Sequence, residues 1–465
     1  MEMVKSERPF GMRDKVGYMF GDFANDLTFV MASMVFMKFY TDVMHVGAGV
    51  VGLIMMLAKL IDAFTDMGMG QIVDHSRVHK KGKFAPWIRR MAVPVAAASF
   101  LMYAVWFKDM PYGFKVFWLT FSYLLWGSFC YTGVNIPYGS MASAITSDPT
   151  ERASLSNWRT IGATLGNLVI GSVLPLIIYE KNAEGNQVIN GQKTMLSGLV
   201  CSLLAIGLYF ACYAMTTERV TMPKKEGKFS WKEFGRVLHK NRSLISIIIV
   251  SILFVLCQTT FNTMQAYIYP NYFNNSTAMA YIFLIGGVIT LVISPFTVKL
   301  VERFGKKELS VFSAILGFGA TLLMTILHTH NLVVWLILYS ITWVGVSIFW
   351  LICWAMITDV IDDTEVHTGI RADGTVYSLY SFARKLGQAA TSGIVGGLLS
   401  AVGYTKETGF QPSVQNGIYY INTVVPMIGF LLFGLTVLFL YPLNKKRVEK
   451  NVEILKGKEL SHSEN

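Results

Sequence analysis

The chain has 465 residues, of which 53% are hydrophobic and only 15% are charged, and its mean hydropathy is +0.46. A soluble protein would carry about a quarter charged residues, so this composition excludes a soluble globular protein and predicts a polytopic membrane protein. The net charge of +11 would suit a nucleic-acid-binding protein, but the placement of the basic residues argues against that partner.

Twelve apolar segments are long enough to cross a bilayer, and Gly, Pro and charged residues separate them. The predicted spans are residues 16–41, 47–72, 88–107, 113–143, 153–179, 195–216, 243–269, 278–301, 308–327, 331–360, 371–403 and 415–441. Thirty of the 40 Lys and Arg residues then fall on one side of the membrane and five on the other. Since basic loops stay in the cytoplasm, we expect a multi-pass protein of the cell (inner) membrane with both termini cytoplasmic. Anionic lipid headgroups are the expected partners of these loops.

One long polar connection, residues 217–242, divides the spans into six and six. The expected domains are an N-terminal six-helix bundle (1–216), a cytoplasmic middle loop (217–242), a C-terminal six-helix bundle (243–441) and a cytoplasmic tail (442–465). Gly82-Lys83 and Gly305-Lys306 follow the second and eighth spans, in corresponding positions of the two halves. Such repetition is typical of secondary carriers.

The second span carries two carboxylates, Asp62 and Asp66, four residues apart and therefore on one helix face. Each costs roughly 2.5–3.5 kcal/mol at the centre of a spanning helix, so the pair predicts a wet, functional cavity. Together with the Thr65 hydroxyl they suit a small hard cation or a proton. The alternative is that they act as polar contacts between helices.

Polar and aromatic residues inside other spans predict a site for a hydroxyl-rich ligand, because sugars are bound by polar side chains and by aromatic planes. They are Asp22, Asn25 and Asp26 in span 1, Tyr131 and Asn135 in span 4, Arg159 in span 5, Trp350 and Trp354 in span 10, and Ser381, Arg384 and Lys385 in span 11. Gly133 and Pro137 could kink span 4 and open a cavity. The tryptophans could instead be packing or interfacial residues, and Asn135 an interhelical contact.

Acidic residues end span 10 on the expected cytoplasmic side. Asp359 and Asp362 could pair with Arg152 and Arg371 as a gate, or could belong to a solvated loop. These two interpretations remain open at this point.

The sequence contains no Walker loop, no His-Glu-x-x-His and no Gly-x-Ser-x-Gly. We therefore expect no enzymatic activity and no cofactor. Uphill transport would need an ion gradient, and the five cysteines, all in apolar segments, are expected to pack rather than pair.

Six motifs, in order along nearly the whole chain, resemble those of the glycoside–pentoside–hexuronide:cation symporters, the melibiose permease family of the major facilitator superfamily. They are Gly21-Asp-Phe-Ala-Asn-Asp26, Phe39-Tyr-Thr-Asp42, Asp62-Ala-Phe-Thr-Asp66, Gly82-Lys83-Phe-x-Pro86-Trp87, Asn135-Ile-Pro-Tyr138 and Arg371-x-Asp-Gly-x-x-Tyr377-Ser. The resemblance implies an all-α membrane protein with twelve transmembrane helices in two six-helix bundles around a central cavity. It also implies symport of a sugar with a cation by alternating access.

The resemblance assigns a cation site to Asp62, Thr65, Asp66 and Thr132. If the ion is sodium, Asp62 and Asp66 would be its carboxylate ligands. It assigns the sugar site to Asn25, Asp26, Tyr131, Asn135, Arg159, Trp350, Ser381 and Lys385. Melibiose permease differs by having Asn at Thr65, Lys at Asn25, Asp at Asn135 and Trp at Gly139. The coupling ion, H⁺ or Na⁺, and the sugar therefore stay open, with the glucuronide and xyloside branches nearest in motif.

Three alternatives can be compared with sugar symport. A carrier of lysolipids or other amphiphiles on the same fold would need a long apolar slot, whereas the predicted site is polar and charged. A non-transporting sugar sensor would need an output domain larger than residues 217–242 or 442–465. A channel would show a uniform ring of charges rather than acids and bases on separate helices.

Overall fold

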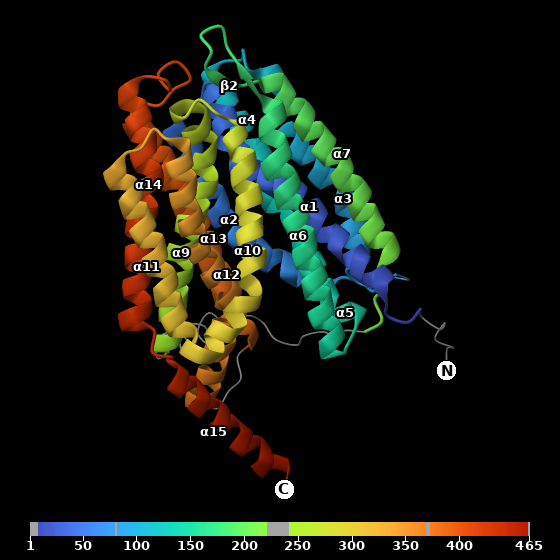
Figure 1. Cartoon of the computed structure of the whole chain (residues 1–465). Coiled ribbons are helices and arrows are strands. Elements are labelled where there is room, and N and C mark those ends of the chain that lie inside the picture. Colours follow the sequence, from blue (N-terminus) through green and yellow to red (C-terminus); the bar gives the residue numbers. More distant parts are fainter. Residues whose placement is uncertain (1–7, 80, 221–240, 369–372, 464–465) are drawn as a thin grey trace. The chain divides into compact units, whose positions relative to one another are not determined.

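The computed structural model describes residues 8–79, 81–220, 241–368 and 373–463 (Figure 1). Within these ranges the chain is a set of long helices and one small hairpin. It forms two compact units. Unit 1 comprises residues 1–227, 265–284 and 392–415, and unit 2 comprises residues 228–264, 285–391 and 416–465.

The first half of the chain contributes most of unit 1. Its helices are α1 (Met12–Asp42), α2 (Ala48–His75), α3 (Ala85–Leu101), η1 (Val105–Phe107), α4 (Tyr112–Leu124), the π-helical η2 (Leu125–Tyr131), α5 (Thr132–Ile145), α6 (Pro149–Ile178) and α7 (Gly191–Met215). Strands β1 (Tyr179–Lys181) and β2 (Gln187–Ile189) form an antiparallel hairpin between α6 and α7. Helix α1 packs against α6 and α7.

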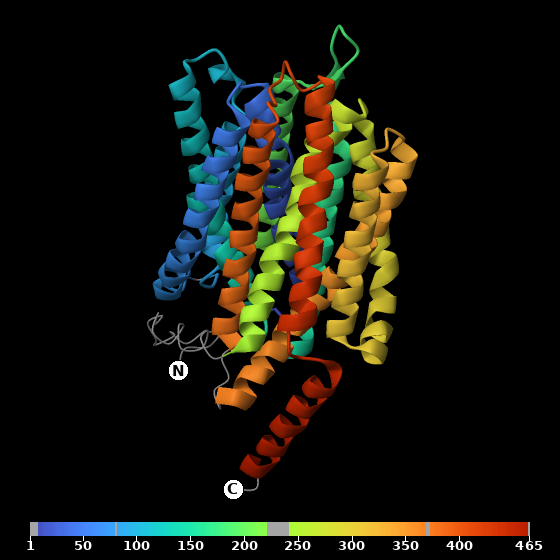
Figure 2. The same cartoon turned by 90° about the vertical axis from the view of Figure 1, so that its left-hand side faces the viewer.

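The second half contributes most of unit 2. Its helices are α9 (Arg242–Tyr267), the π-helical η3 (Ile268–Tyr272), α10 (Thr277–Phe304), α11 (Lys306–Leu327), α12 (Leu332–Thr368), α13 (Asp373–Ala401), α14 (Pro412–Leu435), η4 (Thr436–Leu440) and α15 (Lys445–Ser463). Helix α15 follows the end of α14 and packs against α12 (Figure 2). The predicted tail is therefore helical as far as the structure describes it.

Helices of the described chain cover all twelve predicted spans, with ends that differ by several residues. Nine are long and apolar enough to span a membrane by length and composition, among the residues the structure describes. The segments outside these nine are α1, the α4–η2–α5 segment and α13. These three carry many of the polar residues of the predicted site, and the fourth span is divided into the short helices α4 and α5 by η2.

Local sequence explains one helix cap and one repeated turn. The Asp148 carboxylate caps α6 by accepting from the amides of Thr150 and Glu151 at 2.7 and 2.9 Å, next to Pro149 at the first helical position. Gly82 and Gly305 follow α2 and α10 with φ of 103° and 97°, values that only glycine adopts without strain. The predicted repetition of a Gly/basic turn is therefore also a repetition of backbone conformation.

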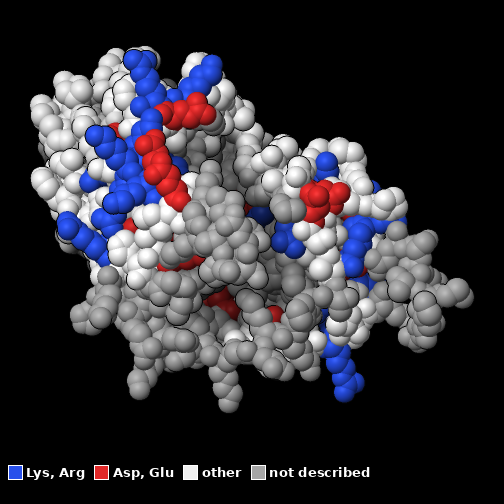
Figure 3. Space-filling model, turned by 90° about the horizontal axis from the view of Figure 1, so that it is seen from below, with Lys and Arg blue, Asp and Glu red and all other residues white. Residues whose placement is uncertain are grey.

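Charged side chains gather on the face seen in Figure 3. In unit 1, Asp14 is buried and pairs with Arg8 at 2.7 Å and with Arg219 at 3.0 Å. In unit 2, Arg447 of α15 lies 3.3 Å from the buried Asp363. Ion pairs thus fix helix ends in each unit.

Candidate functional site

The two carboxylates of α2 face the middle of the fourth span. The Thr132 hydroxyl donates to Asp66 Oδ1 at 2.8 Å, and the Ser128 hydroxyl donates to Asp62 Oδ1. Asp62 is 4% exposed. The structure thus brings three of the four predicted cation-site residues together and adds Ser128, which the sequence analysis did not select.

The π-helical turn of η2 explains why these hydroxyls reach α2. In a π-helix the amide bonds to the carbonyl five residues back, and such turns are frequent at functional sites. The Thr132 amide and hydroxyl both donate to the Gly127 carbonyl, the hydroxyl at 3.1 Å. A Cβ at Gly127 would lie 3.3 Å from both Asp62 carboxylate oxygens, so a larger side chain would press on this carboxylate.

The fourth predicted cation ligand is engaged differently. The Thr65 hydroxyl donates to the main-chain carbonyl of Asp62 at 3.2 Å, within its own helix. Among the described residues, no group of three or more His, Cys, Asp or Glu side chains could hold a metal ion. The cluster is a set of oxygens: two carboxylates, two hydroxyls and a carbonyl. Such a set suits a proton or a hard cation as a transported ion.

Lys59 is a functional candidate to which the sequence analysis gave no role, although it lies within the second predicted span, residues 47–72. Its ammonium lies 3.2 Å from Asp62 Oδ2. The rings of Phe29, Tyr123 and Trp126 surround it, with centroids 5.5 to 5.7 Å away. The site therefore has a built-in positive charge that compensates one of its two carboxylates. The i, i+3 spacing of Lys59 and Asp62 is visible in the sequence and could have identified Lys59 as a partner of this carboxylate.

A second polar cluster joins α1 to α6. Asp26 Oδ2 accepts from Asn167 Nδ2 at 2.9 Å, and Arg159 Nε donates to Asp22 Oδ1 at 3.2 Å. The Arg159 guanidinium also lies 5.5 Å from the centroid of the Tyr138 ring. Asp22 and Asn167 are thus partners of predicted site residues. The sequence analysis included Asp22 among the polar residues of the spans but did not mention Asn167.

The remaining predicted sugar residues of unit 1 lie nearby on α1 and around η2. Asn25 is buried, and its Oδ1 accepts from the Tyr209 hydroxyl of α7 at 2.7 Å. The Tyr131 ring stacks on Phe29 with centroids 5.7 Å apart. Asn135 is half-buried on α5, three residues after Thr132. Asn25 therefore has a structural contact in addition to its predicted role.

Three predicted sugar residues belong to unit 2: Trp350 on α12 and Ser381 and Lys385 on α13. Ser381 is exposed, while Trp350 and Lys385 are half-buried. Trp350 stacks on Phe254 of α9, with centroids 6.4 Å apart. The predicted sugar site draws on both units, so its assembly from these two sets stays a prediction.

The predicted gate residues have the following neighbours. Asp359 lies 2.6 Å from Lys306 Nζ of α11. Arg152 Nε donates to the Thr146 carbonyl at 2.9 Å, beyond the end of α5. Asp362 is half-buried on α12, and Arg371 lies outside the described residues. The gate stays a prediction.

A buried charge cluster of unit 1 was not selected from the sequence. Lys38 and Asp42 of α1 lie 2.8 Å apart, with side chains 2% and 7% exposed. The ammonium also donates to Asn271 Oδ1 of η3 at 2.6 Å and to the Tyr404 hydroxyl, which in turn donates to Asp42. The i, i+4 spacing of Lys38 and Asp42 was visible in the sequence, but their partners were not.

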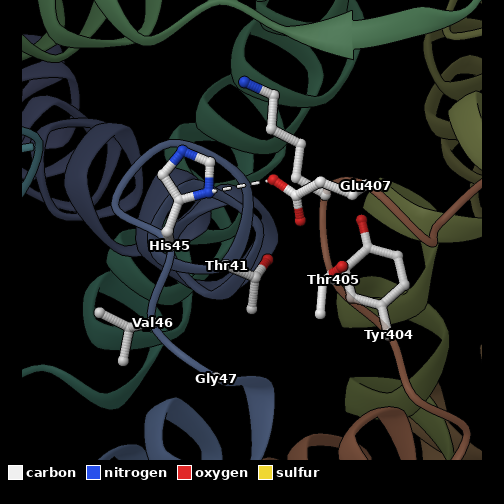
Figure 4. Close-up of a pocket in the computed structure, with 8 residues that line it drawn as sticks. Thr41, His45, Val46, Gly47, Tyr404, Thr405 and Glu407 are labelled. Carbon is white, nitrogen blue, oxygen red and sulfur yellow. Dashed lines mark ion pairs between the residues drawn. The ribbon is translucent and has the colours of Figure 1, made fainter. Parts of the chain in front are cut away.

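A pocket lies beside this cluster (Figure 4). His45 Nδ1 is 3.6 Å from Glu407 Oε1 across it, and Thr41 and Tyr404 line it from α1 and from the connection before α14. A backbone amide, the Thr405 hydroxyl and the nearby His45 hold the pKa of Glu407 below its usual value. The pocket is formed by residues of unit 1 alone.

The comparisons with known proteins agree with the fold. Residues 17–445 match the family described as MFS/sugar transport protein. The chain therefore belongs to this family, which confirms the predicted fold class and the predicted resemblance. It is a multi-pass membrane transporter of the sugar-symporter type rather than an enzyme.

Individual relatives cover nearly the whole chain. It is 31% identical to the "Glucuronide carrier protein homolog" of Escherichia coli K12 over 95% of this chain and 94% of that protein. It is 28% identical to the "Isoprimeverose transporter" of Lactiplantibacillus pentosus over 92% and 88%. Among solved structures, a bacterial homologue of the lysosomal transporter Spinster matches with a TM-score of 0.70 at 10% identity, over 94% of this chain and 97% of that one. The nucleoside transporter NupG matches at 0.61 and 14% identity, over 91% and 99%. At these identities the structural matches show the fold alone.

Proposed function

We propose that this chain takes up a sugar or glycoside together with a proton or Na⁺ bound at Asp62 and Asp66. The observation that carries the proposal is the α2 cluster, where two carboxylates accept hydroxyl hydrogen bonds from the π-helical span. Buried carboxylates in a spanning helix are costly and mark ion pathways. The names of the relatives, a glucuronide carrier homolog and an isoprimeverose transporter, support a glycoside as the second solute.

The charge of the cluster supports a positively charged coupling ion. Lys59, whose ammonium lies 3.2 Å from Asp62, adds one positive charge to the two carboxylates. A proton or Na⁺ would be bound in addition to this ammonium. Neutralisation would then favour sugar binding, and by linkage sugar would favour ion binding to the same extent.

We favour a proton over Na⁺ because Thr65 offers a hydroxyl where melibiose permease has an amide. That hydroxyl is already engaged with the Asp62 carbonyl. The test is substrate-induced alkalinisation of lightly buffered, sodium-free vesicles. A signal that requires added Na⁺ would reverse the preference.

The rest of the working scheme is also proposed. The sugar would contact Asp26 and Arg159 from unit 1 and Trp350, Ser381 and Lys385 from unit 2. Both termini would lie in the cytoplasm of a cell whose inner membrane holds the carrier. The excess of basic residues in the connections assigned to that side supports this orientation. The predicted gate would operate at the same side.

The deciding experiment is Asp66→Asn in reconstituted vesicles. We expect it to abolish accumulation of a glycoside against its gradient while sugar exchange between equal pools persists, because the amide cannot take up the coupling ion. Asp74→Asn, two turns further along α2, is the matched control and should accumulate normally. Accumulation by Asp66→Asn would remove this carboxylate from coupling.

A further inference from the structure

Two glycines let α6 lie directly against α1 within unit 1 (Figure 1). A Cβ at Gly162 would lie 2.3 Å from the Met19 carbonyl oxygen, and a Cβ at Gly166 would lie 2.5 Å from the Asp26 Cβ. Neither position leaves room for a larger side chain. Small residues four apart are a common way for spanning helices to come close. The contact brings Asn167, which follows Gly166 in the chain, to the Asp26 carboxylate.

The partners of Asn167 fix the orientation of its amide. The Nδ2 atom donates to Asp26 Oδ2 and to the Ala163 carbonyl, both at 2.9 Å. Both partners are acceptors, so the nitrogen of the amide and not its oxygen must face them. Within the part of the chain that the structure describes, neither Asn167 Oδ1 nor Asp26 Oδ1 accepts a further hydrogen bond. The pair therefore has two acceptor oxygens left for a ligand, and both donors of the amide are already used.

The pair is accessible, although it lies near the middle of two predicted spans. Asn167 is exposed and Asp26 is half-buried. Polar groups at this depth face the interior of a helix bundle or a water-filled cavity rather than lipid. Asp26 also belongs to the predicted sugar site. The exposed oxygens of the pair are therefore placed where a hydroxyl-rich ligand is expected.

We propose that Asn167 is a positioning residue of the sugar site, which orients the Asp26 carboxylate and adds its own Oδ1 as a second acceptor for the same ligand. The inference rests on the proposed sugar-transport function and adds a residue that the motifs do not contain. A pair that can only accept matches two ring hydroxyls that both donate. A site built for hydroxyl donors rejects an analogue without them, because its buried acceptors would stay unpaired.

The test measures sugar affinity of the purified full-length protein by calorimetry. Methyl β-D-glucoside, methyl β-D-xyloside and methyl β-D-glucuronide are the probes, and the one that binds most tightly is the reference. Analogues of the reference then replace one ring hydroxyl at a time by hydrogen or by fluorine. In the wild type, two ring positions should lose about tenfold or more in affinity with both replacements, because neither hydrogen nor fluorine donates a hydrogen bond.

The decisive variant is Asn167→Leu, which keeps the size of the side chain and removes both polar atoms. We expect it to bind the reference about tenfold more weakly. Removal of one of the two hydroxyls should then cause no further loss, because its acceptor is already gone. The affinity for the coupling ion, measured without sugar as the pH or Na⁺ midpoint of tryptophan fluorescence, should change less than about threefold.

Two more variants and a control complete the series. Asn167→Gln keeps the amide on a longer stem and should restore part of the hydroxyl dependence, and Asn167→Ala serves if Asn167→Leu does not fold. Thr164→Val is the matched control, because the Thr164 hydroxyl donates within α6 to the Thr160 carbonyl at 2.8 Å. It removes a polar group from the same helix without removing a hydrogen bond to Asp26. Its affinities should stay within about threefold of the wild-type values.

The outcomes distinguish this inference from the function on which it rests. Unchanged affinity in Asn167→Leu, or an equal loss for the reference and every analogue, would overturn the inference, because Asn167 would then be only a contact between helices. Sugar binding by the wild type would leave the proposed function in place in either case. Failure of the wild type to bind any of the three probes would overturn both.

Discussion

The ion pair of Lys38 and Asp42 is a sensitive point in unit 1, because both side chains are almost completely buried. Asp42→Asn would leave the ammonium buried beside Asn271 and Tyr404, without a counter-charge. Removing one partner of such a pair costs about 3–5 kcal/mol, since the remaining charge is neither hydrated nor compensated. We therefore expect Asp42→Asn to destabilise the protein by an amount in this range.

The reverse change should cost less. In Lys38→Met the Asp42 carboxylate keeps the Tyr404 hydroxyl at 2.9 Å and the Thr41 hydroxyl at 2.9 Å. We expect a loss near the lower end of the same range, about 3 kcal/mol. The double variant Lys38→Met/Asp42→Leu removes both charges. Its loss of stability should be much smaller than the summed losses of the two single variants, because replacing a buried ion pair by apolar residues is often neutral.

Thermal unfolding in detergent measures these effects, with a thiol-reactive dye that reports exposure of the buried cysteines. Each kcal/mol lowers the midpoint of a 150–250-residue domain by about 2–4 °C, so the single variants should unfold several degrees lower. The control is the exposed pair Lys193–Glu180, 2.9 Å apart with side chains 46% and 40% exposed. Lys193→Gln should cost only about 0–1 kcal/mol.

Two results would refute this reasoning. If Asp42→Asn unfolds at the wild-type midpoint, water hydrates the Lys38 ammonium and the ion pair is not shielded from solvent. If the double variant loses the full sum of the single effects, Lys38 and Asp42 do not stabilise each other.

Three further predictions follow from the described contacts. Lys59→Gln should lower the coupling-ion concentration that gives half-maximal sugar uptake at least about tenfold, because it frees Asp62 from the ammonium 3.2 Å away. If the ion is a proton, the pH midpoint of uptake should move upward. An unchanged titration would contradict this. Glu218→Gln should lower the unfolding midpoint by the equivalent of about 1–2 kcal/mol, because the Glu218 carboxylate accepts three backbone amides at the start of α3, at 2.6 to 2.9 Å; a wild-type midpoint would show that this cap adds no stability. Hydrogen bonds from Lys193 and Asn190 hold the pKa of Glu180 below its usual 4.5. This pair therefore stabilises the fold above pH 4.5 and loses its effect as the pH falls through the lowered pKa, so the midpoint difference between wild type and Lys193→Gln should shrink below pH 4.5.

The sequence determined the class of fold because membrane insertion is a local property of each segment. Twenty apolar residues span a bilayer wherever they occur in a chain, and the backbone must be helical there. The twelve spans were therefore predicted from the sequence alone. A role for Asp62 and Asp66 was predicted in the same way, because the cost of a carboxylate in a span is equally local, and it stays a prediction. Helix ends were less certain, because caps and π-helical turns such as η2 depend on neighbouring helices.

The tertiary structure decided which polar groups meet. The sequence predicted Arg159 and Asp26 as ligand contacts, but packing of α1 on α6 gives them the partners Asp22 and Asn167. Ser128 joins Asp62 only because η2 turns it toward α2. Hydrogen bonds and ion pairs reach only a few ångströms, so partners over a hundred residues apart are fixed by helix packing and not by periodicity.

The same holds for Lys38 and Arg384, two cations within predicted spans. A charge is costly within a membrane-spanning segment, and the sequence does not show what compensates these two. The structure gives Lys38 a carboxylate one turn away and an amide from η3, and it gives Arg384 two tryptophan rings of α12. Whether a buried charge is neutralised by the protein or remains available to a ligand depends on these long-range neighbours, which only the folded chain brings into place.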